Sequence, residues 1–556
     1  MRQRSLLSKM GLLRAIAIQR SIKIDTILIF LVLLFILICF VYGRLHLYAF
    51  GELGSVVTRI PDDTGYFYKI ARNVVLGKGL TFDGINKTNG FQPLWLYLLL
   101  PVAWITRHLS VDTYLRVALI YQLILVALAG IIFYLAVAMY HRRGIALAAT
   151  ALFYLLGANW FANGMETGIL ILCLVTLLYF SIKYQLFSNE YQPKKAFIFG
   201  LLFGLTILAR LDMIILLIVV YTYLIIWLFN SSDNLNRNLK INQIFITSIA
   251  ICLIVLPYFI YNQIRFGSIM PISGQLKNSF PYIVQADFST NRFPLQVIYG
   301  LSIIIIYFIF NIFFTIRSFK IKDPLSQYWI TIMFIGALTI FFHYLNTALF
   351  MKWAVFSWHF SFYFIYICLV FSDILKLISS HISLAASRWV LNFILIMLIG
   401  GLMIRSYRIA TTPPLGWHVQ AYRAALWARA HTEPQSIFAM KDAGLFGLLS
   451  DRTVINLDGL VNNIEYQKYL MKKELNKYFN KNNIEYLVQH AIWESETPEY
   501  KAVLESSYDW LDLRFRSRLY NTMSDPIRVY RQDEVYRSER YYDGRYWTVF
   551  IIWKLR

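Results

Sequence analysis

The chain has 556 residues, of which 58% are hydrophobic and only 15% charged, a composition that excludes an ordinary soluble protein. Its net charge of +22 does not indicate nucleic-acid binding, because the basic residues cluster in short loops between apolar segments, where they report membrane topology. All the cysteines lie within apolar runs, so no disulfide framework is expected: Cys39, Cys173, Cys252 and Cys368.

The first apolar run, Thr26 to Gly43, follows a basic segment and lacks a small-residue cleavage site. It therefore predicts a retained membrane anchor with the N-terminus in the cytoplasm. Alternation of the basic loops from there predicts about eleven spans, the last near Trp389 to Arg405. Two of them are short, Ala196 to Ala209 and Asp212 to Leu228. The sequence thus predicts a polytopic α-helical protein of the plasma membrane, with a transmembrane domain over residues 1–405.

Residues 44–112 form the first outer loop, which is too long for a simple connector and is therefore expected to be functional. From Thr64 to Leu76, apolar residues gather on one helical face, which predicts an amphipathic helix lying flat on the membrane surface. A second apolar segment, Pro93 to Ile105, is short for a span. It is expected to be a re-entrant or interfacial helix.

Two adjacent carboxylates, Asp62 and Asp63, stand in this loop just before the amphipathic helix. A helix cap explains one of them, because an Asp side chain accepts hydrogen bonds from the first free amides. The other is left beside a membrane surface, where a general base for an acceptor hydroxyl would be useful. Catalysis is therefore favoured over capping for this pair.

Further charged residues are expected at the same outer level. Glu166 begins a span, where an interfacial cap and a functional carboxylate are equally good explanations. Arg210 and Asp212 are expected to neutralise one another as a salt bridge. Outer-face cations that could meet an anionic headgroup, or be ordinary surface charges, are Arg265, Lys277 and Lys352. Aromatic and imidazole groups at this level are on base rates packed or interfacial: His343, His359, Trp353 and Trp358.

From about Ser406 the composition becomes that of a soluble domain, and alternation of the spans places residues 406–556 outside the membrane as an α/β domain. Asp442 and Asp458 in it are expected to be turn or cap residues. The expected strands are Ser436 to Ala439, Thr453 to Leu457 and Ile484 to Val488, with a helix over Asn463 to Asn480. The motifs of metalloproteases, P-loop enzymes and serine hydrolases are absent from the sequence, so those activities lack support.

Residues 60–99, IPDDTGYFYKIARNVVLGKGLTFDGINKTNGFQPLWLYLL, resemble the first outer loop of the GT-C superfamily of membrane glycosyltransferases. This superfamily includes protein O-mannosyltransferases, the lipid A aminoarabinose transferase and arabinofuranosyltransferases. The similarity continues in NGMETGIL at 163–170, LTILARLDMI at 205–214, RFGSIMPISGQLKN at 265–278 and DAGLFGLLSDRTVINLDGLVNN at 442–463.

The resemblance implies an enzyme that moves a sugar from a polyprenyl-phosphate donor to a glycan, lipid or protein acceptor at the outer face of the membrane. It assigns the base to Asp62 or Asp63, with Asp62 favoured, and gives Glu166 a part in binding acceptor or metal. A divalent cation (Mg²⁺, Mn²⁺ or Ca²⁺) at Asp63 and Glu166 stays open. Trp358 and His359 stand where relatives often have Trp-Tyr, a departure at the second position of a segment that would contact the sugar.

The chemistry of these residues also suits the reaction when the family resemblance is set aside. A departing lipid phosphate needs cations, for which the candidates are Lys277, Arg265 and Arg210 in that order. A single displacement would invert the anomeric configuration, because no second nucleophilic carboxylate is obvious. The alternatives are a transporter or flippase of lipid-linked sugars, since intramembrane charges also mark substrate paths, and an envelope-complex scaffold.

Overall fold

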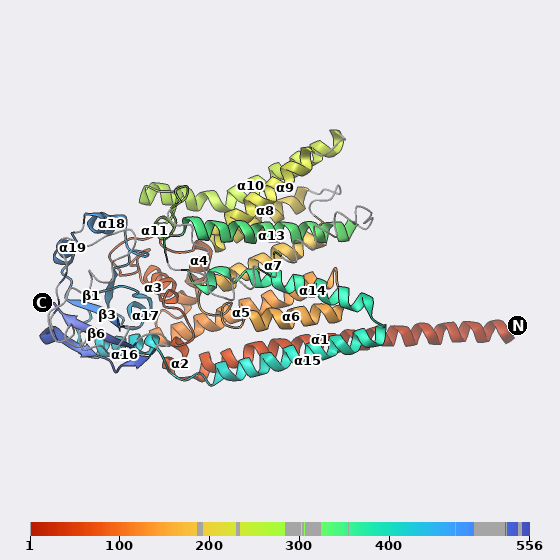
Figure 1. Ribbon diagram of the computed structural model, residues 1–556, viewed down its shortest axis with the longest axis horizontal. Coiled ribbons are helices and arrows are strands. Elements are labelled where there is room, and N and C mark those ends of the chain that lie inside the picture. Colours follow the sequence, from red (N-terminus) through yellow and green to blue (C-terminus); the bar gives the residue numbers. More distant parts are fainter. Residues whose placement is uncertain are drawn as a thin grey trace.

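The computed structural model describes most of the chain in continuous ranges, with a few isolated positions. The ranges are 2–185, 193–229, 234–283, 324–353, 355–472, 474–493, 531–542 and 547–555, and the isolated positions are 302, 305, 527 and 529. The N-terminal end of the first helix and the C-terminal domain lie at opposite ends of the molecule (Figure 1).

Long helices run along the length of the molecule and form its membrane domain (Figure 1). Within the described ranges, seven helices are long and apolar enough to cross a membrane. They are Thr26–Phe50 of α1 (Arg2–Phe50), α5 (Val111–Ala138), α7 (Thr167–Tyr184), Arg237–Phe266 of α10 (Asn234–Phe266), Leu325–Phe350 of α13 (Pro324–Phe350), α14 (Tyr363–His381) and α15 (Leu384–Ala410). The protein is therefore a polytopic membrane protein, as the hydropathy predicted.

Shorter helices complete the bundle: α6 (Arg143–Gly157), α8 (Pro193–Ala209) and α9 (Ile214–Phe229), the last preceded by the 3-10 turn η1 (Leu211–Met213). Helix α8 and the η1–α9 segment fall where the two short spans are expected. The span that charge alternation requires between Arg292 and Arg317 lies outside the described residues. The total of about eleven spans therefore stays a prediction.

Small residues allow the helices of the bundle to pack closely. Helix α1 meets α15 at Gly43, whose amide donates to Ser406 Oγ at 2.8 Å. A Cβ atom at Gly43 would lie 2.1 Å from the Ser406 carbonyl oxygen. Between α8 and α10, a Cβ at Gly200 would lie 2.5 Å from the Thr247 carbonyl oxygen. Close backbone approach at small residues is a usual means of association between membrane helices.

The first outer loop carries α2 (Leu53–Val57), α3 (Thr64–Val75) and α4 (Pro93–Ile105). Helix α3 occurs where the sequence predicted it, but the expectation that its polar side would face water was wrong. Lys69 and Asn73, on the polar side, are only 6% and 2% exposed. The C-terminal domain covers Lys69, whose Nζ donates to the Arg452 carbonyl oxygen at 3.4 Å. The first loop itself covers Asn73, whose Nδ2 donates to the carbonyl oxygens of Thr81 at 3.0 Å and Phe82 at 2.9 Å. Helix α3 is therefore enclosed by protein rather than laid on lipid.

The C-terminal domain is built around one mixed β-sheet. Its described elements are α16 (Trp417–His431), β1 (Ile437–Met440), α17 (Gly444–Leu449), β2 (Thr453–Asn456), α18 (Ile464–Met471), α19 (Leu475–Lys481), β3 (Tyr486–Trp493), η3 (Arg531–Asp533), β4 (Glu534–Arg537), β5 (Tyr541–Tyr542) and β6 (Trp547–Lys554). Within the described residues the strand order is β2-β1-β3-β6-β4, with β5 also paired to β6. Strand β1 runs parallel to β2 and β3, whereas β6 is antiparallel to β3 and β4.

All three strands expected from the sequence are present, with their ends shifted by a few residues. The single helix expected from Asn463 to Asn480 is instead two helices, α18 and α19. Asn463 caps the first, because its side chain accepts from the Tyr466 amide at 2.8 Å. Helix α18 ends at Met471, and the chain turns before Leu475 begins α19. Lys468 of α18, Lys472 in the turn and Lys477 of α19 line one hollow together with Lys87 of the first loop.

Candidate active site

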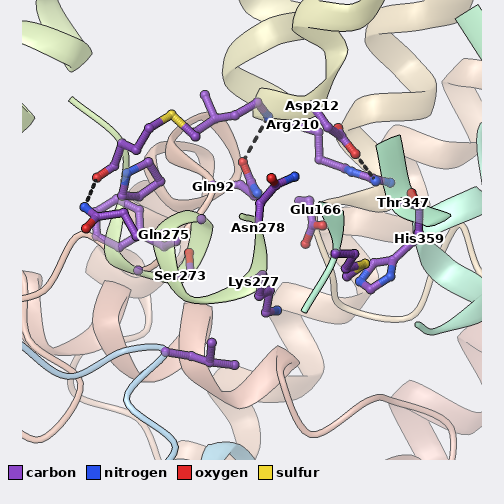
Figure 2. A pocket seen from close by; sticks show the side chains of 18 of the residues that line it. Gln92, Glu166, Arg210, Asp212, Ser273, Gln275, Lys277, Asn278, Thr347 and His359 are labelled. Carbon is purple, nitrogen blue, oxygen red and sulfur yellow. Dashed lines mark hydrogen bonds and ion pairs between the residues drawn. The ribbon is translucent and has the colours of Figure 1, made fainter. Parts of the chain in front are cut away.

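A cavity of about 850 Å³ lies where the membrane helices, the first outer loop and the C-terminal domain meet. Its polar lining includes Glu166, Arg210, Lys277 and His359, which are labelled in Figure 2. Asp63 and Lys352 line it as well. Leu460 and Val461 of the C-terminal domain close one side, and Ile214, Ile215 and Phe259 of the membrane helices form an apolar side. The cavity thus combines clustered charges with a wall that continues into the bundle.

Asp62 is not among the residues that line this cavity. Its carboxylate accepts hydrogen bonds from the Gly444 amide at 2.8 Å and the Leu445 amide at 2.7 Å, at the start of α17. Both oxygens are therefore used, and the side chain is 7% exposed. Burial raises the pKa of Asp62, and the two amides act in the opposite direction. Asp62 caps a helix, but that helix belongs to the C-terminal domain and not to the first loop.

Asp63 points the other way, into the cavity. It stands at the N-cap position of α3, yet within the described residues its side chain makes no capping hydrogen bond. One carboxylate oxygen lies 4.0 Å from Lys277 Nζ. Burial raises the pKa of Asp63, whereas the Lys277 ammonium lowers it. Asp63 is thus an available carboxylate with a cation beside it, which suits a base that must take up a proton.

The contact between α3 and α17 fixes the direction of these two carboxylates. A Cβ atom at Gly65 would lie 2.0 Å from the Gly444 carbonyl oxygen, and one at Gly444 would lie 2.0 Å from the Asp62 carbonyl oxygen. Next to this contact, the Tyr66 hydroxyl donates to Asp458 Oδ2 at 3.1 Å and accepts from Asn456 Nδ2 at 3.1 Å. The backbones can approach this closely only because both positions are glycine.

Glu166 reaches the cavity from a turn that is held on several sides. Gly164, at φ +88°, donates its amide to Gln122 Oε1 at 2.6 Å and accepts from Trp95 Nε1 at 2.9 Å. The Glu166 side chain makes no capping bond to α7, and within the described part of the chain its buried Oε2 has no hydrogen-bond partner. Burial raises the pKa of Glu166, while Arg210 and Lys277 lower it. The capping explanation for Glu166 therefore has no support in the geometry.

Arg210 lies at the start of η1 and pairs with Asp212, as the sequence suggested. His343 Nε2 is 3.0 Å from the same Asp212 oxygen, and His343 Nδ1 is 3.0 Å from the Tyr363 hydroxyl. Asp212 therefore orients Arg210 rather than facing a ligand alone. Arg210 is 5% exposed, and its Nη1 has no hydrogen-bond partner among the described residues. A buried guanidinium with a free edge is suited to binding an oxyanion.

Lys277 and Lys352 are brought to the cavity together by a short antiparallel bridge. Helix α11 (Ile272–Lys277) ends at Lys277, and the following Asn278 pairs with Met351 beyond the end of α13. The Lys352 amide donates to the Lys277 carbonyl oxygen at 2.8 Å, and Lys352 Nζ donates to the Gln275 carbonyl oxygen at 3.3 Å. Two cations that are distant in sequence thus share one wall.

Trp358 and His359 belong to the 3-10 turn η2 (Ser357–Phe360) and line the cavity. His359 Nδ1 accepts from the Phe356 amide at 3.3 Å. Burial lowers the pKa of His359, and the nearby Arg210 and Lys277 lower it further, so the imidazole is neutral. With Nδ1 used as an acceptor, the proton resides on Nε2, which makes His359 a hydrogen-bond donor and not a base.

Two solved structures are similar to this chain in fold. The apo oligosaccharyltransferase of Archaeoglobus fulgidus matches with a TM-score of 0.52 and 15% identity, over 85% of this chain and 71% of that chain. ArnT from Cupriavidus metallidurans, solved bound to undecaprenyl phosphate, matches with a TM-score of 0.51 and 10% identity, over 91% of this chain and 97% of that chain. The chain has the GT-C fold.

A family described as a domain of unknown function (DUF8728) matches residues 410–549, which cover most of the C-terminal domain of this GT-C chain. Sequence comparison with curated proteins found no match. The GT-C fold is therefore established here by structure, and the individual residue roles rest on the geometry of the cavity.

Arg265 is the one predicted phosphate ligand that the GT-C fold does not bring to the cavity. It lies in the last turn of α10 and lines a separate groove with Lys87, Lys468 and Lys472. The sequence analysis expected Arg265 to bind phosphate together with Lys277 and Arg210, but those two residues line the cavity and Arg265 does not. The order of residues along the sequence does not show which of the two pockets a loop residue lines.

The cavity of this GT-C chain does not form a good site for a resident divalent cation. Asp63 and Glu166 both line it, but Lys277 lies beside Asp63 and its charge also acts on Glu166. Across the described ranges, no group of three or more His, Cys, Asp or Glu side chains could hold a metal ion. Lys277 thus supplies a positive charge close to Asp63 that also acts on Glu166.

Several amides of the GT-C cavity were missed by the sequence reasoning. Gln92 Oε1 accepts from the Leu211 amide at 3.3 Å, a bond drawn in Figure 2 that ties the first loop to η1. Asn278 and Asn346 also line the cavity, with 3.5 Å between their side chains. The only signal for Gln92 was its place in the Gly-Phe-Gln-Pro turn before α4, and neutral amides carry no charge cue.

Proposed function

We propose that this protein is an inverting glycosyltransferase that moves a sugar from a polyprenyl-phosphate donor to an acceptor at the outer face of the membrane. The observation that carries the proposal is the convergence of Asp63, Lys277 and Arg210 on one cavity whose wall continues into the membrane helices. The GT-C fold supports it, and ArnT, a protein of similar fold, was solved with undecaprenyl phosphate.

In this proposal Asp63, and not Asp62, is the general base. Each Asp62 oxygen accepts a hydrogen bond from a backbone amide, and the residue does not line the cavity, so Asp62 is not directed at a substrate there. Asp63 faces the cavity beside Lys277, whose charge favours the ionised form of the carboxylate against the effect of burial. Glu166 lies in the same cavity with a free oxygen and is suited to hold another hydroxyl of the acceptor or the sugar.

The departing phosphate is held by the cations. The acceptor oxygen forms a bond to the anomeric carbon as the bond from that carbon to the phosphate oxygen breaks. The hydroxyl proton goes to Asp63, and the negative charge that develops on the phosphate is stabilised by Lys277 and Arg210. His359 and Trp358 are available for the sugar, the first as a donor and the second through its ring. Attack opposite the leaving phosphate inverts the anomeric configuration.

Donor binding should depend on Lys277. Undecaprenyl phosphate added to the purified protein is expected to raise its melting temperature, because a ligand stabilises the form that binds it. The Lys277→Gln variant should lose most of this shift, because it removes a cavity cation whose one salt bridge within the described residues is the 4.0 Å contact with Asp63. The matched control is Arg265→Gln, which removes an equal charge from the separate groove and should keep the shift. Equal shifts in both variants would contradict the assignment of the phosphate site.

The rate of transfer should fall in acid as Asp63 becomes protonated. Lys277 lowers the pKa of Asp63, so removing it raises that pKa. The acidic limb of the pH–rate profile, measured at saturating donor, should therefore move to higher pH in Lys277→Gln than in the wild type. A limb that stays in place or moves to lower pH would show that Asp63 is not the titrating base.

A further inference from the structure

A second hollow lies between the membrane domain and the C-terminal domain, outside the catalytic cavity. This groove has a volume of about 730 Å³. Lys87 of the first outer loop and Arg265 at the end of α10 form one side, and α18 and α19 form the other. Figure 1 shows α18 and α19 on the same side of the C-terminal domain as α11 and the end of α10.

The charges in this groove are unbalanced. Its acidic residues are neutralised by neighbours, because Glu465 pairs with Lys481 at 2.5 Å and Glu474 pairs with Lys477 at 3.6 Å. Four further cations that line the groove make no salt bridge with any described residue: Lys87, Arg265, Lys468 and Lys472. They come from three separate segments of the chain. Like charges that converge from distant segments repel one another unless an anion lies between them.

The groove and the catalytic cavity share a wall. Leu460 and Val461 line the cavity, whereas Asn463 and Ile464, just beyond them, line the groove. Asn463 Nδ2 donates to Asn86 Oδ1 at 2.7 Å, which fastens this wall to the first outer loop. An extended molecule held in the groove would therefore present its end to the cavity after crossing only this segment.

We propose that the groove binds an anionic glycan, one that carries phosphate, sulfate or carboxylate groups, and that this glycan is the acceptor. The acceptor role rests on the proposed glycosyltransferase function. A glycan suits the groove better than a lipid does, because charged and amide side chains dominate the lining and only Phe266 and Ile464 are apolar. The Tyr469 ring, which also lines the groove, offers a surface on which a sugar can stack.

Binding is tested with fluorescent dextran sulfate and with neutral dextran of the same length, on the full protein in detergent at low salt. The wild type should bind the sulfated chain and not the neutral one. The Lys468→Gln/Lys472→Gln variant should bind the sulfated chain at least about tenfold more weakly. Both lysines are exposed, so their loss leaves the fold intact. The matched control, Lys78→Gln/Lys554→Gln, removes two exposed cations outside the groove and should bind as the wild type does.

Equal binding by the two double variants would overturn the groove assignment. So would a loss of affinity for phosphatidylglycerol nanodiscs, relative to phosphatidylcholine, in the Lys468/Lys472 variant with dextran sulfate binding unchanged, because that result identifies a lipid site. Asp63→Asn should still bind dextran sulfate, which separates a failure of the groove from a failure of the proposed chemistry. In transfer assays, dextran sulfate should compete with an envelope glycan acceptor and not with the donor; competition with the donor alone would overturn the acceptor role.

Discussion

Asp63→Asn should reduce sugar transfer from a radiolabelled polyprenyl-phosphate donor by about 10²- to 10⁴-fold, the range that removal of a general base usually produces. Asparagine fills the same space but cannot take up the hydroxyl proton. Undecaprenyl phosphate should still raise the melting temperature of the variant, because Lys277 and Arg210 remain in place. Unchanged transfer in this variant would contradict the proposed chemistry and favour the transporter or scaffold alternatives, neither of which needs a base.

Asp62→Asn provides the control on the adjacent residue. One side of an asparagine amide is a donor, so it cannot accept from both the Gly444 and Leu445 amides as the carboxylate does. Leaving a buried amide without its acceptor costs about 1–3 kcal/mol, so this variant should melt at a lower temperature than the wild type. The Asp63→Asn variant should not melt at a lower temperature than the wild type. If Asp62→Asn is fully stable but inactive and Asp63→Asn is active, the general base is Asp62 and not Asp63.

Gly444→Ala should separate the C-terminal domain from the first outer loop. The new Cβ atom would lie 2.0 Å from the Asp62 carbonyl oxygen, a contact with backbone that no side-chain rotation can relieve. Such overpacking typically costs about 1–3 kcal/mol, and here it also displaces the residue before Asp63. Loss of transfer, a lower melting temperature and faster proteolysis at the junction of the two domains should appear together.

Gly400→Ala is the matched substitution. A Cβ atom at Gly400 would meet nothing within 4 Å, in the middle of α15. Alanine is a better helix former than glycine, so stability should be unchanged or slightly higher. If Gly444→Ala is as stable and active as Gly400→Ala, the contact between α3 and α17 does not position the catalytic residues.

Much of the architecture follows from the sequence because membrane helices obey simple rules. Uncharged runs of spanning length are visible directly, and the strands of the C-terminal domain show short apolar runs between turn residues. The environment of α3 could not be predicted in this way. Its polar face, with Lys69 and Asn73, looks like a water-facing surface. Lys69 is covered by Arg452, hundreds of residues later in the chain, and Asn73 is covered by the irregular segment that follows the helix.

The residues of the candidate site likewise include some that the sequence could predict and some that it could not. The outer loops that supply Glu166, Arg210 and Lys277 could be named from charge and topology, and all three residues line the cavity. The sequence favoured Asp62 over Asp63 as the base, but adjacent side chains at a helix start point in different directions, and the contact with Gly444 that occupies Asp62 is not visible in the sequence. The prediction that Arg265 lies with the other cations was wrong for a related reason, because topology predicts the side of the membrane and not the position on that side.

The cap that Asp62 forms on α17 also bears on how the protein is made. The first loop emerges early from the ribosome, whereas Gly444 and Leu445 follow only after nearly all the spans have been inserted. During synthesis Asp62 therefore lacks the amides that hold it, and Leu460 and Val461 have not yet closed the cavity. Without the C-terminal domain the cavity thus lacks one of its walls, and the first loop gains its hold on α17 only after that domain has been made.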